Sequence, residues 1–212
     1  MNVLKTILFF ISITVPCLTG QAQASEQDLN FDVLRNGEKI GNHQIIFEKH
    51  GADLNVSIQT DVEVKIMFVP VYKFHHKSME TWKNGQLVGL YSKTNDDGTL
   101  HQLSLARQNN VLSGTSDGKE ISITRDILPA SLWHPKIINS LSLLNTLEGH
   151  EMKIAVHHIG QEIMTTDKGT QPADYYKLTG ELERELWFDK DQRLIKVRFK
   201  GSDDSEITYK LI

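Results

Sequence analysis

A long alternation of apolar and polar residues constrains the fold of this chain more than any other feature. Between Leu54 and Phe68, apolar residues occupy nearly every second position, and polar or charged residues stand between them. Side chains on a β-strand point alternately to its two faces, so this period of two predicts one long strand with a buried face and a solvated face. The segments "EISITRDI", "LERELWF" and "EITYKLI" repeat the pattern.

Short turn signals separate these segments. They include "RNGEKIG", "KNGQLVG", "NDDGT" and "SDGKE", and Asn-Gly and Asp-Gly are strong markers of tight hairpins. Strands joined by such short turns pair in the antiparallel sense. The sequence therefore predicts a mainly β fold of roughly eleven to thirteen strands, built as a single strongly curved antiparallel sheet or incomplete barrel.

The segment 128–150, "LPASLWHPKIINSLSLLNTLEGH", does not follow this period. Its apolar residues recur at spacings of three and four, which predicts an amphipathic helix packed against the concave side of the sheet. Pro135 suits the first turn of such a helix, and Gly149 suits the position just after its end. Trp133 and His134 then have two compatible interpretations, as the start of the helix or as a lid over a ligand cavity.

The first residues have the pattern of a cleaved leader. Lys5 precedes a short apolar run, and "AQA" at 22–24 supplies the small residues of a signal-peptidase site. We therefore predict a signal peptide over 1–24 and one β-rich domain over 25–212, located in the periplasm of a Gram-negative cell. The apolar run is too short to span a bilayer, so we predict no transmembrane anchor. Cys17 also permits lipoprotein processing, but Pro16 before it fits that signal poorly.

Charge and cysteine content limit the possible partners. The formal net charge is −4, the leader contributes Lys5, and the only cysteine is Cys17 within that leader. The domain is therefore predicted to lack disulfides and to have no electrostatic affinity for nucleic acid or anionic lipid.

Three stretches resemble a secreted Gram-negative family of unknown function, the one numbered six-one-three-four among such domains. They are "VPVYKFHHKSMETWKNGQLVGLYSKTNDDGTLHQL" (69–103), "LPASLWHPKIINSLSLLNTLEG" (128–149) and "YYKLTGELERELWFDKDQRLIKVRFKGSD" (175–203). The family looks like the open barrels of lipoprotein-carrier proteins, in which a curved sheet and a plugging helix enclose an apolar cavity. The resemblance implies that architecture and brings no catalytic residues with it.

Two motifs carry possible catalytic chemistry. "GTSDG" (114–118) matches the nucleophile pattern of hydrolases, but a β-type alternation follows Ser116 where a hydrolase needs a helix. We interpret it as an exposed hairpin turn. "HEMKIAVHH" (150–158) has Ile154 where a zinc helix needs its second histidine, so no metal or other cofactor is predicted.

The stretch "YKFHHKSMETW" (72–82) is the remaining candidate site. Counting by two from Phe74 places His76 and Glu80 on the inner face and His75 on the outer face. His158 faces inward by the same rule, so the three could converge on a metal or acid–base site. The alternative is a wall of hydrogen-bonded polar side chains.

These observations favour a non-enzymatic binding or carrier module for an apolar or amphipathic ligand, such as a lipid-like molecule. The predicted ligand-binding residues are Val64, Ile66, Phe68, Tyr72, Phe74, His76, Glu80, Trp82, Trp133, Ile138 and Leu141. The first alternative is a structural or assembly factor of the cell envelope, with a packed core and a protein partner. The second is a hydrolase or metal-dependent enzyme using the His76/Glu80 region.

Overall fold

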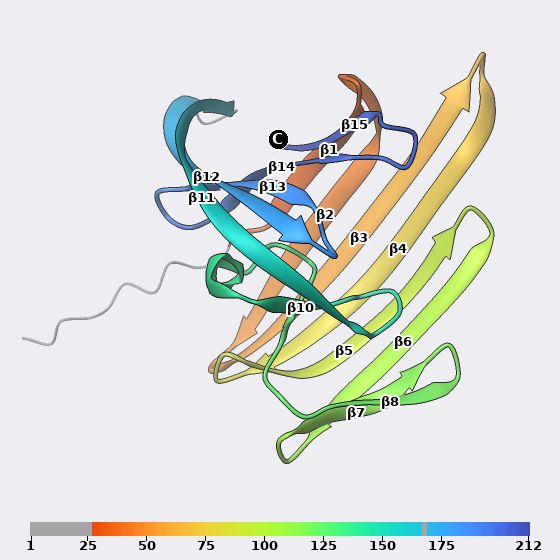
Figure 1. Cartoon of the computed structure of the whole chain (residues 1–212), viewed down its shortest axis with the longest axis vertical. Coiled ribbons are helices and arrows are strands. Elements are labelled where there is room, and N and C mark those ends of the chain that lie inside the picture. Colours follow the sequence, from red (N-terminus) through yellow and green to blue (C-terminus); the bar gives the residue numbers. More distant parts are fainter. Residues whose placement is uncertain (1–26, 167–168) are drawn as a thin grey trace, which may run out of the picture.

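A computed structural model describes residues 27–166 and 169–212, which form one continuous sheet of fifteen strands (Figure 1). The strands are β1 (Leu29–Arg35), β2 (Glu38–His50), β3 (Asp53–Ile66), β4 (Val69–Lys83), β5 (Gln86–Asp96), β6 (Thr99–Gln108), β7 (Val111–Ser116), β8 (Lys119–Ile123), β9 (Leu128–Pro129), β10 (Ser142–Leu144), β11 (Glu151–Thr166), β12 (Gly169–Gly180), β13 (Arg184–Asp189), β14 (Leu194–Lys200) and β15 (Glu206–Leu211). The predicted leader, with Cys17 and the cleavage site after Ala24, lies outside the described residues.

The strand order is β8-β7-β6-β5-β4-β3-β2-β1-β15-β14-β13-β12-β11-β10-β9. Each strand pairs antiparallel with its neighbours, except that β9 and β10 pair in parallel. The sheet curls, and β8 and β9 remain as its two edges, so it is an open sheet and not a closed barrel. The predicted mainly β, antiparallel, incompletely closed architecture is confirmed. The strand number exceeds the expected range because β9 and β10 come from the segment predicted to be helical.

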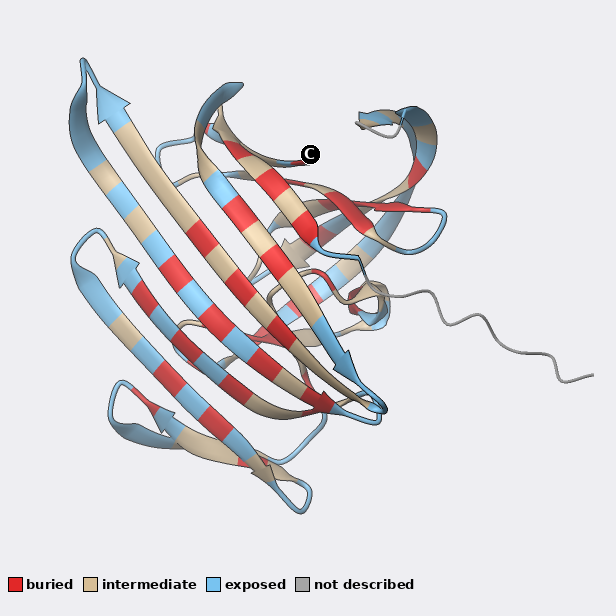
Figure 2. Cartoon of the chain, turned by 180° about the vertical axis from the view of Figure 1, so that it is seen from behind, coloured by how far each residue is buried: buried red, intermediate tan, exposed pale blue. Residues whose placement is uncertain are grey.

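Burial follows the predicted alternation. On β3, Val56, Ile58 and Thr60 are buried while the residues between them are partly exposed. Figure 2 shows the same alternation as red and blue bands along the long strands. The inner faces of both halves of the curled sheet contribute to one core, whose fully buried members include Phe31, Leu90 and Trp187. Within the described residues, no helix is long and apolar enough to cross a membrane.

The predicted amphipathic helix is wrong. The only helical turn in this region is the 3-10 helix η1 (Pro135–Asn139), which ends where the Ser140 N–H donates to the Ile137 carbonyl. The following residues form β10, which obtains backbone hydrogen-bond partners from both β9 and β11. The apolar residues with helical spacing thus lie in an irregular segment. Ser140 and Ser142 have low helix propensity, which favours this outcome.

This irregular segment, residues 128–149, packs inside the curled sheet, and we call it the plug. Trp133, Ile137, Leu143 and Leu144 of the plug are buried in the common core. The plug therefore fills the space that the predicted helix was expected to cover, although it has a different backbone conformation.

Hydroxyl groups on the sheet hold the final turn of the plug. Ser92 Oγ donates to the Thr146 carbonyl at 2.5 Å, and Ser116 Oγ donates to the Glu148 carbonyl at 2.6 Å. Gly149 then follows with φ +74°, and a Cβ at that position would lie 2.5 Å from Ile121 Cδ1. The turn is therefore fitted closely against β5 to β8.

Candidate functional site

Glu80 connects the inner face of β4 to the plug. Its side chain is fully buried, and its Oε2 accepts hydrogen bonds from Trp82 Nε1 at 2.9 Å and from Trp133 Nε1 at 3.0 Å. The two indole rings meet edge to face, with centroids 5.7 Å apart. One carboxylate oxygen therefore links a sheet tryptophan to a plug tryptophan.

The electrostatic environment of Glu80 is unusual. Burial raises the pKa of this carboxyl from 4.5 to about 7, although the Ser131 hydroxyl and the two indole N–H groups oppose the shift. Glu80 Oε1 and Ser131 Oγ lack hydrogen bonds of normal geometry within the described residues, so Ser131 acts as a nearby dipole and not as a bonded donor. The group can thus change its charge near neutral pH.

A row of alternating histidine and threonine residues crosses the same inner face. Strand register places His43 opposite Thr60, Thr60 opposite His76, His76 opposite Thr94, and Thr94 opposite His101. His43 Nδ1 and Thr60 Oγ1 are 2.7 Å apart, as are His76 Nδ1 and Thr94 Oγ1. The row is a hydrogen-bonded wall, the second of the two interpretations drawn from the sequence.

The two buried histidines of this row are held neutral. Burial lowers the pKa of His43 to about 3, with a smaller contribution from His76, and burial lowers the pKa of His76 to about 4. Neutral imidazoles that already bond to threonine hydroxyls suit a structural role better than proton transfer near neutral pH.

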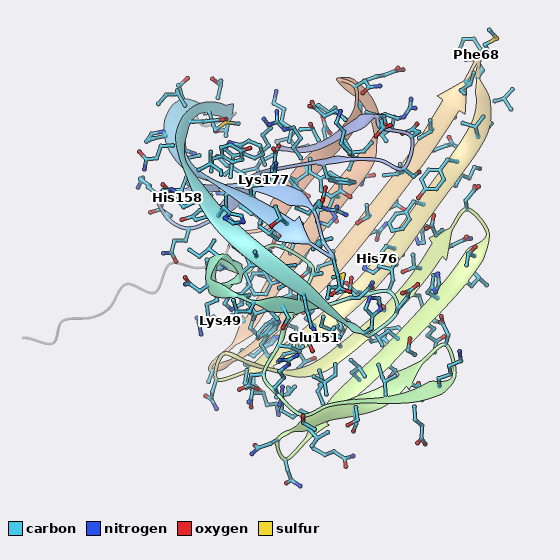
Figure 3. All side chains as sticks on the ribbon, viewed as in Figure 1. Lys49, Phe68, His76, Glu151, His158 and Lys177 are labelled. Carbon is cyan, nitrogen blue, oxygen red and sulfur yellow. The ribbon has the colours of Figure 1, made fainter. Side chains whose placement is uncertain are left out.

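The orientation predicted for the 72–82 stretch is confirmed, but the convergence with His158 is wrong. His76 and Glu80 are buried, and His75 is exposed and pairs with Asp61. His158 lies beside Tyr176 on β12, at an irregularity of the β11–β12 pairing, and its side chain is 53% exposed. Figure 3 shows His158 on β11, apart from His76 on β4. Within the described residues, no cluster of three or more His, Cys, Asp or Glu side chains could hold a metal.

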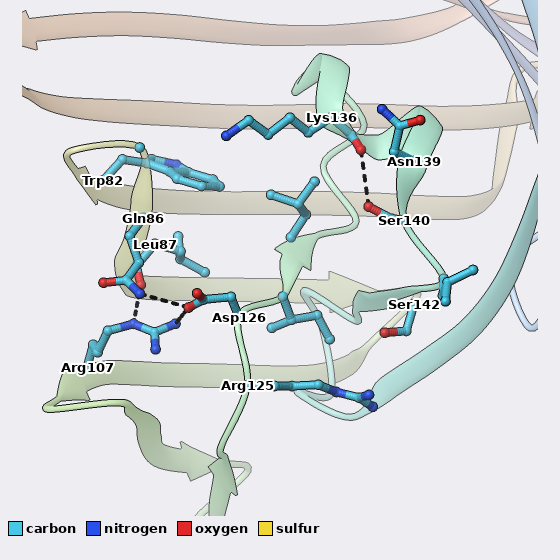
Figure 4. Close-up of a pocket in the computed structure, with 14 residues that line it drawn as sticks. Trp82, Gln86, Leu87, Arg107, Arg125, Asp126, Lys136, Asn139, Ser140 and Ser142 are labelled. Atoms are coloured by element: carbon cyan, nitrogen blue, oxygen red, sulfur yellow. Dashed lines mark hydrogen bonds and ion pairs between the residues drawn. The ribbon is translucent and has the colours of Figure 1, made fainter.

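A half-open pocket of about 440 Å³ lies next to Trp82, between the sheet and the plug (Figure 4). Its apolar lining consists of Trp82, Leu87, Ile127, Leu128 and Leu141. Its charged lining consists of Arg107, Arg125, Asp126 and Lys136. The pocket therefore combines an apolar wall with a predominantly cationic rim.

The cations of this rim differ in their pairing. Arg107 is almost wholly buried, donates from Nε to the Leu87 carbonyl, and pairs with Asp126 at 3.2 Å. Arg125 pairs with Glu151. Lys136 is exposed at the start of η1 and makes no ion pair with any described residue. Of the three cations, Lys136 is therefore the one whose charge remains available to a ligand.

The predicted lining residues do not enclose one cavity. Trp82 and Leu141 border the Trp82 pocket, although Leu141 is 82% exposed at its edge. Trp133 borders a second pocket of about 640 Å³, whose lining includes Gln27 and Thr166 at the limits of the described ranges. His134 caps η1, as the helix-start interpretation predicted, with its Nδ1 accepting from the Lys136 N–H.

Two of the predicted lining residues, both in the β3–β4 hairpin, lie away from any enclosed interior. Ile66 and Phe68 are 60% and 95% exposed at the end of the β3–β4 hairpin, so their assignment to a cavity is wrong. Val64, Tyr72 and Phe74 are half-buried nearby, and Ile138 is half-buried in η1. The period of two gave the correct face, but it could not show that the hairpin extends beyond the rest of the sheet.

The GTSDG motif forms the predicted hairpin turn between β7 and β8. Asp117 and Gly118 both have positive φ, as the two central residues of such a turn require. The prediction that the motif is exposed is wrong for Ser116, which is buried and bonded to the Glu148 carbonyl. This hydroxyl holds the plug.

Sequence reasoning missed the rim of the Trp82 pocket and most of the His/Thr row. The rim residues come from β6, the 124–127 connection and η1, and no local pattern unites them. The row could have been found, because counting outward from each hairpin turn aligns His43 with Thr60 and Thr94 with His101.

Comparison with known proteins gives a family and a fold. A crystal structure of a β-barrel-like protein of the domain of unknown function DUF1849 from Brucella abortus superposes with a TM-score of 0.63 at 9% sequence identity, covering 87% of this chain and 94% of that chain. At this identity the likeness shows the fold alone. A search of curated proteins gave no match.

The sequence resemblance is confirmed by a family model. The model for the domain of unknown function DUF6134 matches residues 31–212, which contain all of the sheet beyond the first residues of β1. The protein therefore belongs to the DUF6134 family.

Proposed function

We propose that the protein is a non-enzymatic binding or carrier module for an amphipathic molecule, located in the periplasm. The observation that carries this proposal is the Trp82 pocket, where an apolar wall meets a cationic rim. Its volume of about 440 Å³ lies in the range of small-molecule sites. The leader-like sequence over 1–24 supports the periplasmic location.

The lining suggests the chemical class of the ligand. An alkyl chain against Trp82, Leu87 and Leu128 would lose its contact with water. A carboxylate or phosphate at the mouth would meet the ammonium group of Lys136. A fatty acid or a single-chain acidic lipid combines these two parts.

The experiment uses a dansyl-labelled fatty acid as the probe, titrated against the purified mature protein. Leu141→Asp and Lys136→Glu alter two exposed rim positions, so neither should disturb the fold. Each should weaken probe binding by about tenfold, since each removes an interaction of roughly 1.4 kcal/mol. Leu100→Asp and Lys190→Glu, at exposed positions outside the pocket, are the matched controls and should bind like wild type. Equal affinities for all five proteins would refute the proposed site.

One observation favours a second candidate, a structural or assembly factor of the envelope. The centre of the sheet is filled by the plug, and a filled interior is expected of a module that acts through its surface. In-cell cross-linking distinguishes the two. A single protein captured reproducibly, with no co-purifying small molecule in native mass spectrometry, would favour the assembly factor.

The geometry gives no support to acid–base catalysis at His76 and Glu80. Their side chains are 6% and 0% exposed, and each bonds to different partners. A substrate would have to displace Trp133 of the plug to reach Glu80.

A further inference from the structure

The β3–β4 hairpin projects beyond the rest of the sheet. Pairing of β2 with β3 stops at Val62, and pairing of β4 with β5 stops at Phe74. Beyond these points β3 and β4 pair only with each other, as a two-stranded arm over residues 63–73, and Lys73 at its base still bonds to the neighbouring turn, where the Lys73 carbonyl accepts from the Asp97 N–H. At about 3.3 Å per residue, the arm extends on the order of 15 Å past its neighbours. Figure 3 shows Phe68 at its end, away from the body of the molecule.

The end of this arm is apolar and exposed. Ile66, Met67, Phe68, Val69 and Val71 are 60%, 89%, 95%, 61% and 47% exposed. We call these five residues the apolar tip. A surface of this kind at the end of a projecting arm is unfavourable in water unless something covers it.

The other two-residue hairpin turns in the described chain have a different composition. Those before β8 are Asn36-Gly37, Gly51-Ala52, Asn84-Gly85, Asp97-Gly98, Asn109-Asn110 and Asp117-Gly118. In the tip, Met67 and Phe68 both have positive φ, at 48° and 72°. This conformation favours Asn and Gly and costs a bulky side chain conformational energy. The turn thus retains two large apolar residues at a cost in stability, although they support no packing within the described chain.

The size of the tip identifies the kind of surface that would cover it. A stable protein interface buries roughly 800 Å² on each partner, which is far more than a single hairpin end can offer. A lipid interface requires only that apolar side chains enter by about 5–10 Å, at the depth of the headgroups. A narrow projecting turn fits the second requirement.

The charges behind the tip fit the same surface. Lys65 and Lys73 lie on the two strands of the arm and share Glu63, at 2.7 Å and 3.1 Å. The arm therefore carries a small net positive charge at the level where lipid headgroups would lie, and lysine side chains can extend toward them. Since the chain as a whole is acidic, apolar insertion and not net charge must supply the affinity.

We propose that the apolar tip of the β3–β4 hairpin is a membrane-docking site that inserts Met67 and Phe68 into the interface of a phospholipid bilayer. The proposal does not depend on the Trp82 pocket, which lies at a different part of the sheet.

The test is flotation of the purified mature protein with vesicles of phosphatidylethanolamine and phosphatidylglycerol. The wild type should float, and Met67→Ser/Phe68→Ser should reduce the bound fraction by about tenfold or more. Leu100→Ser removes another exposed apolar residue, 72% exposed at the neighbouring hairpin, and should bind like wild type. Failure of the wild type to float, or equal binding by the double variant, would overturn the proposal.

Two further variants separate docking from folding. Met67→Asn/Phe68→Gly gives the turn the residues that its conformation favours. The melting temperature of this variant should therefore be no lower than that of the wild type, but it should no longer bind the vesicles. Phe68→Trp places an indole at the tip, whereas the native tryptophans are 3%, 5% and 0% exposed. Brominated lipid should therefore quench the tryptophan fluorescence of this variant and leave that of the wild type unchanged. Absence of quenching, or a protein partner lost on the double substitution without any vesicle binding, would contradict a lipid role.

Discussion

Glu80 shows how a single side chain can connect two parts of a fold. Its Oε2 accepts two indole N–H groups, one from β4 and one from the plug, in a site without solvent contact. An ionised carboxylate in such a site is costly, because two hydrogen bonds only partly replace its hydration. The pKa of Glu80 is raised to about 7 because of that cost.

The Glu80→Gln substitution should change the pH dependence of stability. The folded state holds a proton on Glu80 up to about pH 7, whereas the unfolded chain releases it near pH 4.5. The contribution of Glu80 is therefore complete below pH 4.5 and is lost as the pH rises to about 7, by about 3 kcal/mol at 1.36 kcal/mol per pKa unit.

Urea unfolding of both proteins across this pH range measures the effect. His43 and His76 have lowered pKa values, so their contribution is present above about pH 6.5 and is lost as the pH falls. This opposite trend is common to both proteins and cancels in their difference. The wild-type advantage over Glu80→Gln should shrink as the pH rises, and a constant difference would show that Glu80 does not titrate in this range.

Ser116→Ala should destabilise the protein through the plug. The substitution removes a 2.6 Å hydrogen bond and leaves the Glu148 carbonyl without that donor, at a cost of about 1–2 kcal/mol. Ser122→Ala, at an exposed position on β8, is the control and should stay within about 0.5 kcal/mol of wild type. Equal midpoints in urea would show that the hydroxyl does not hold the plug.

The plug is the element that the sequence describes least well. Its apolar residues recur at helical spacing, yet the backbone forms only η1 and two short strands. The apolar spacing could not reveal this outcome, because the backbone of β10 pairs with β9 and β11, and the spacing of apolar residues within the segment does not encode these pairings. The position of the segment against the concave face was predictable, since no other apolar segment could cover that face.

Gly149→Ala tests how closely the plug turn is fitted. The new methyl group would meet Ile121 Cδ1 and Leu103 Cδ1 at 2.5 Å and 2.6 Å, in a backbone with φ +74°. Gly118→Ala introduces the same chemical change at φ +79°, with no atom within 4 Å. We expect Gly118→Ala to cost about 1 kcal/mol for the backbone alone, and Gly149→Ala to cost about 1–3 kcal/mol more for the overpacking. Thermal melts of the two variants measure the difference. Similar melting temperatures would mean that the core side chains rearrange easily around the added methyl group.

At the scale of the whole molecule, the period of two fixed most of the architecture in advance. Each hairpin turn determines which residues face each other, so the inward orientation of His76 and Glu80 followed from Phe74 alone. The joining of the two halves of the sheet did not follow, because the pairing of β1 with β15 connects segments that share no local signal. The Trp82 pocket depends on the same long-range arrangement, and for that reason its rim could not be predicted.

The mature protein should begin at Ser25. Cleavage after Ala24 removes the apolar run and Cys17 together, so N-terminal sequencing and intact mass of protein from the native envelope should give residues 25–212. An acylated Cys17 at the N-terminus would contradict both the cleavage site and the free periplasmic form.

The strand order also has a consequence for folding kinetics. The edges of the sheet, β8 and β9, are consecutive in the chain and are separated only by residues 124–127, whereas β1 and β15 pair in the middle of the sheet, where the Ile212 N–H donates to the Asn30 carbonyl. A circular permutant cut within 124–127, with a short turn joining β15 to β1, would pair every strand with its neighbour in sequence, including the parallel pair β9–β10. The β1–β15 pairing would then close a short loop, so it should form faster than in the natural chain, whereas the contacts of the plug with β4 to β8 would span more of the sequence. In the natural chain, by contrast, β1 cannot pair with β15 until all the strands between them in the sequence have been synthesised.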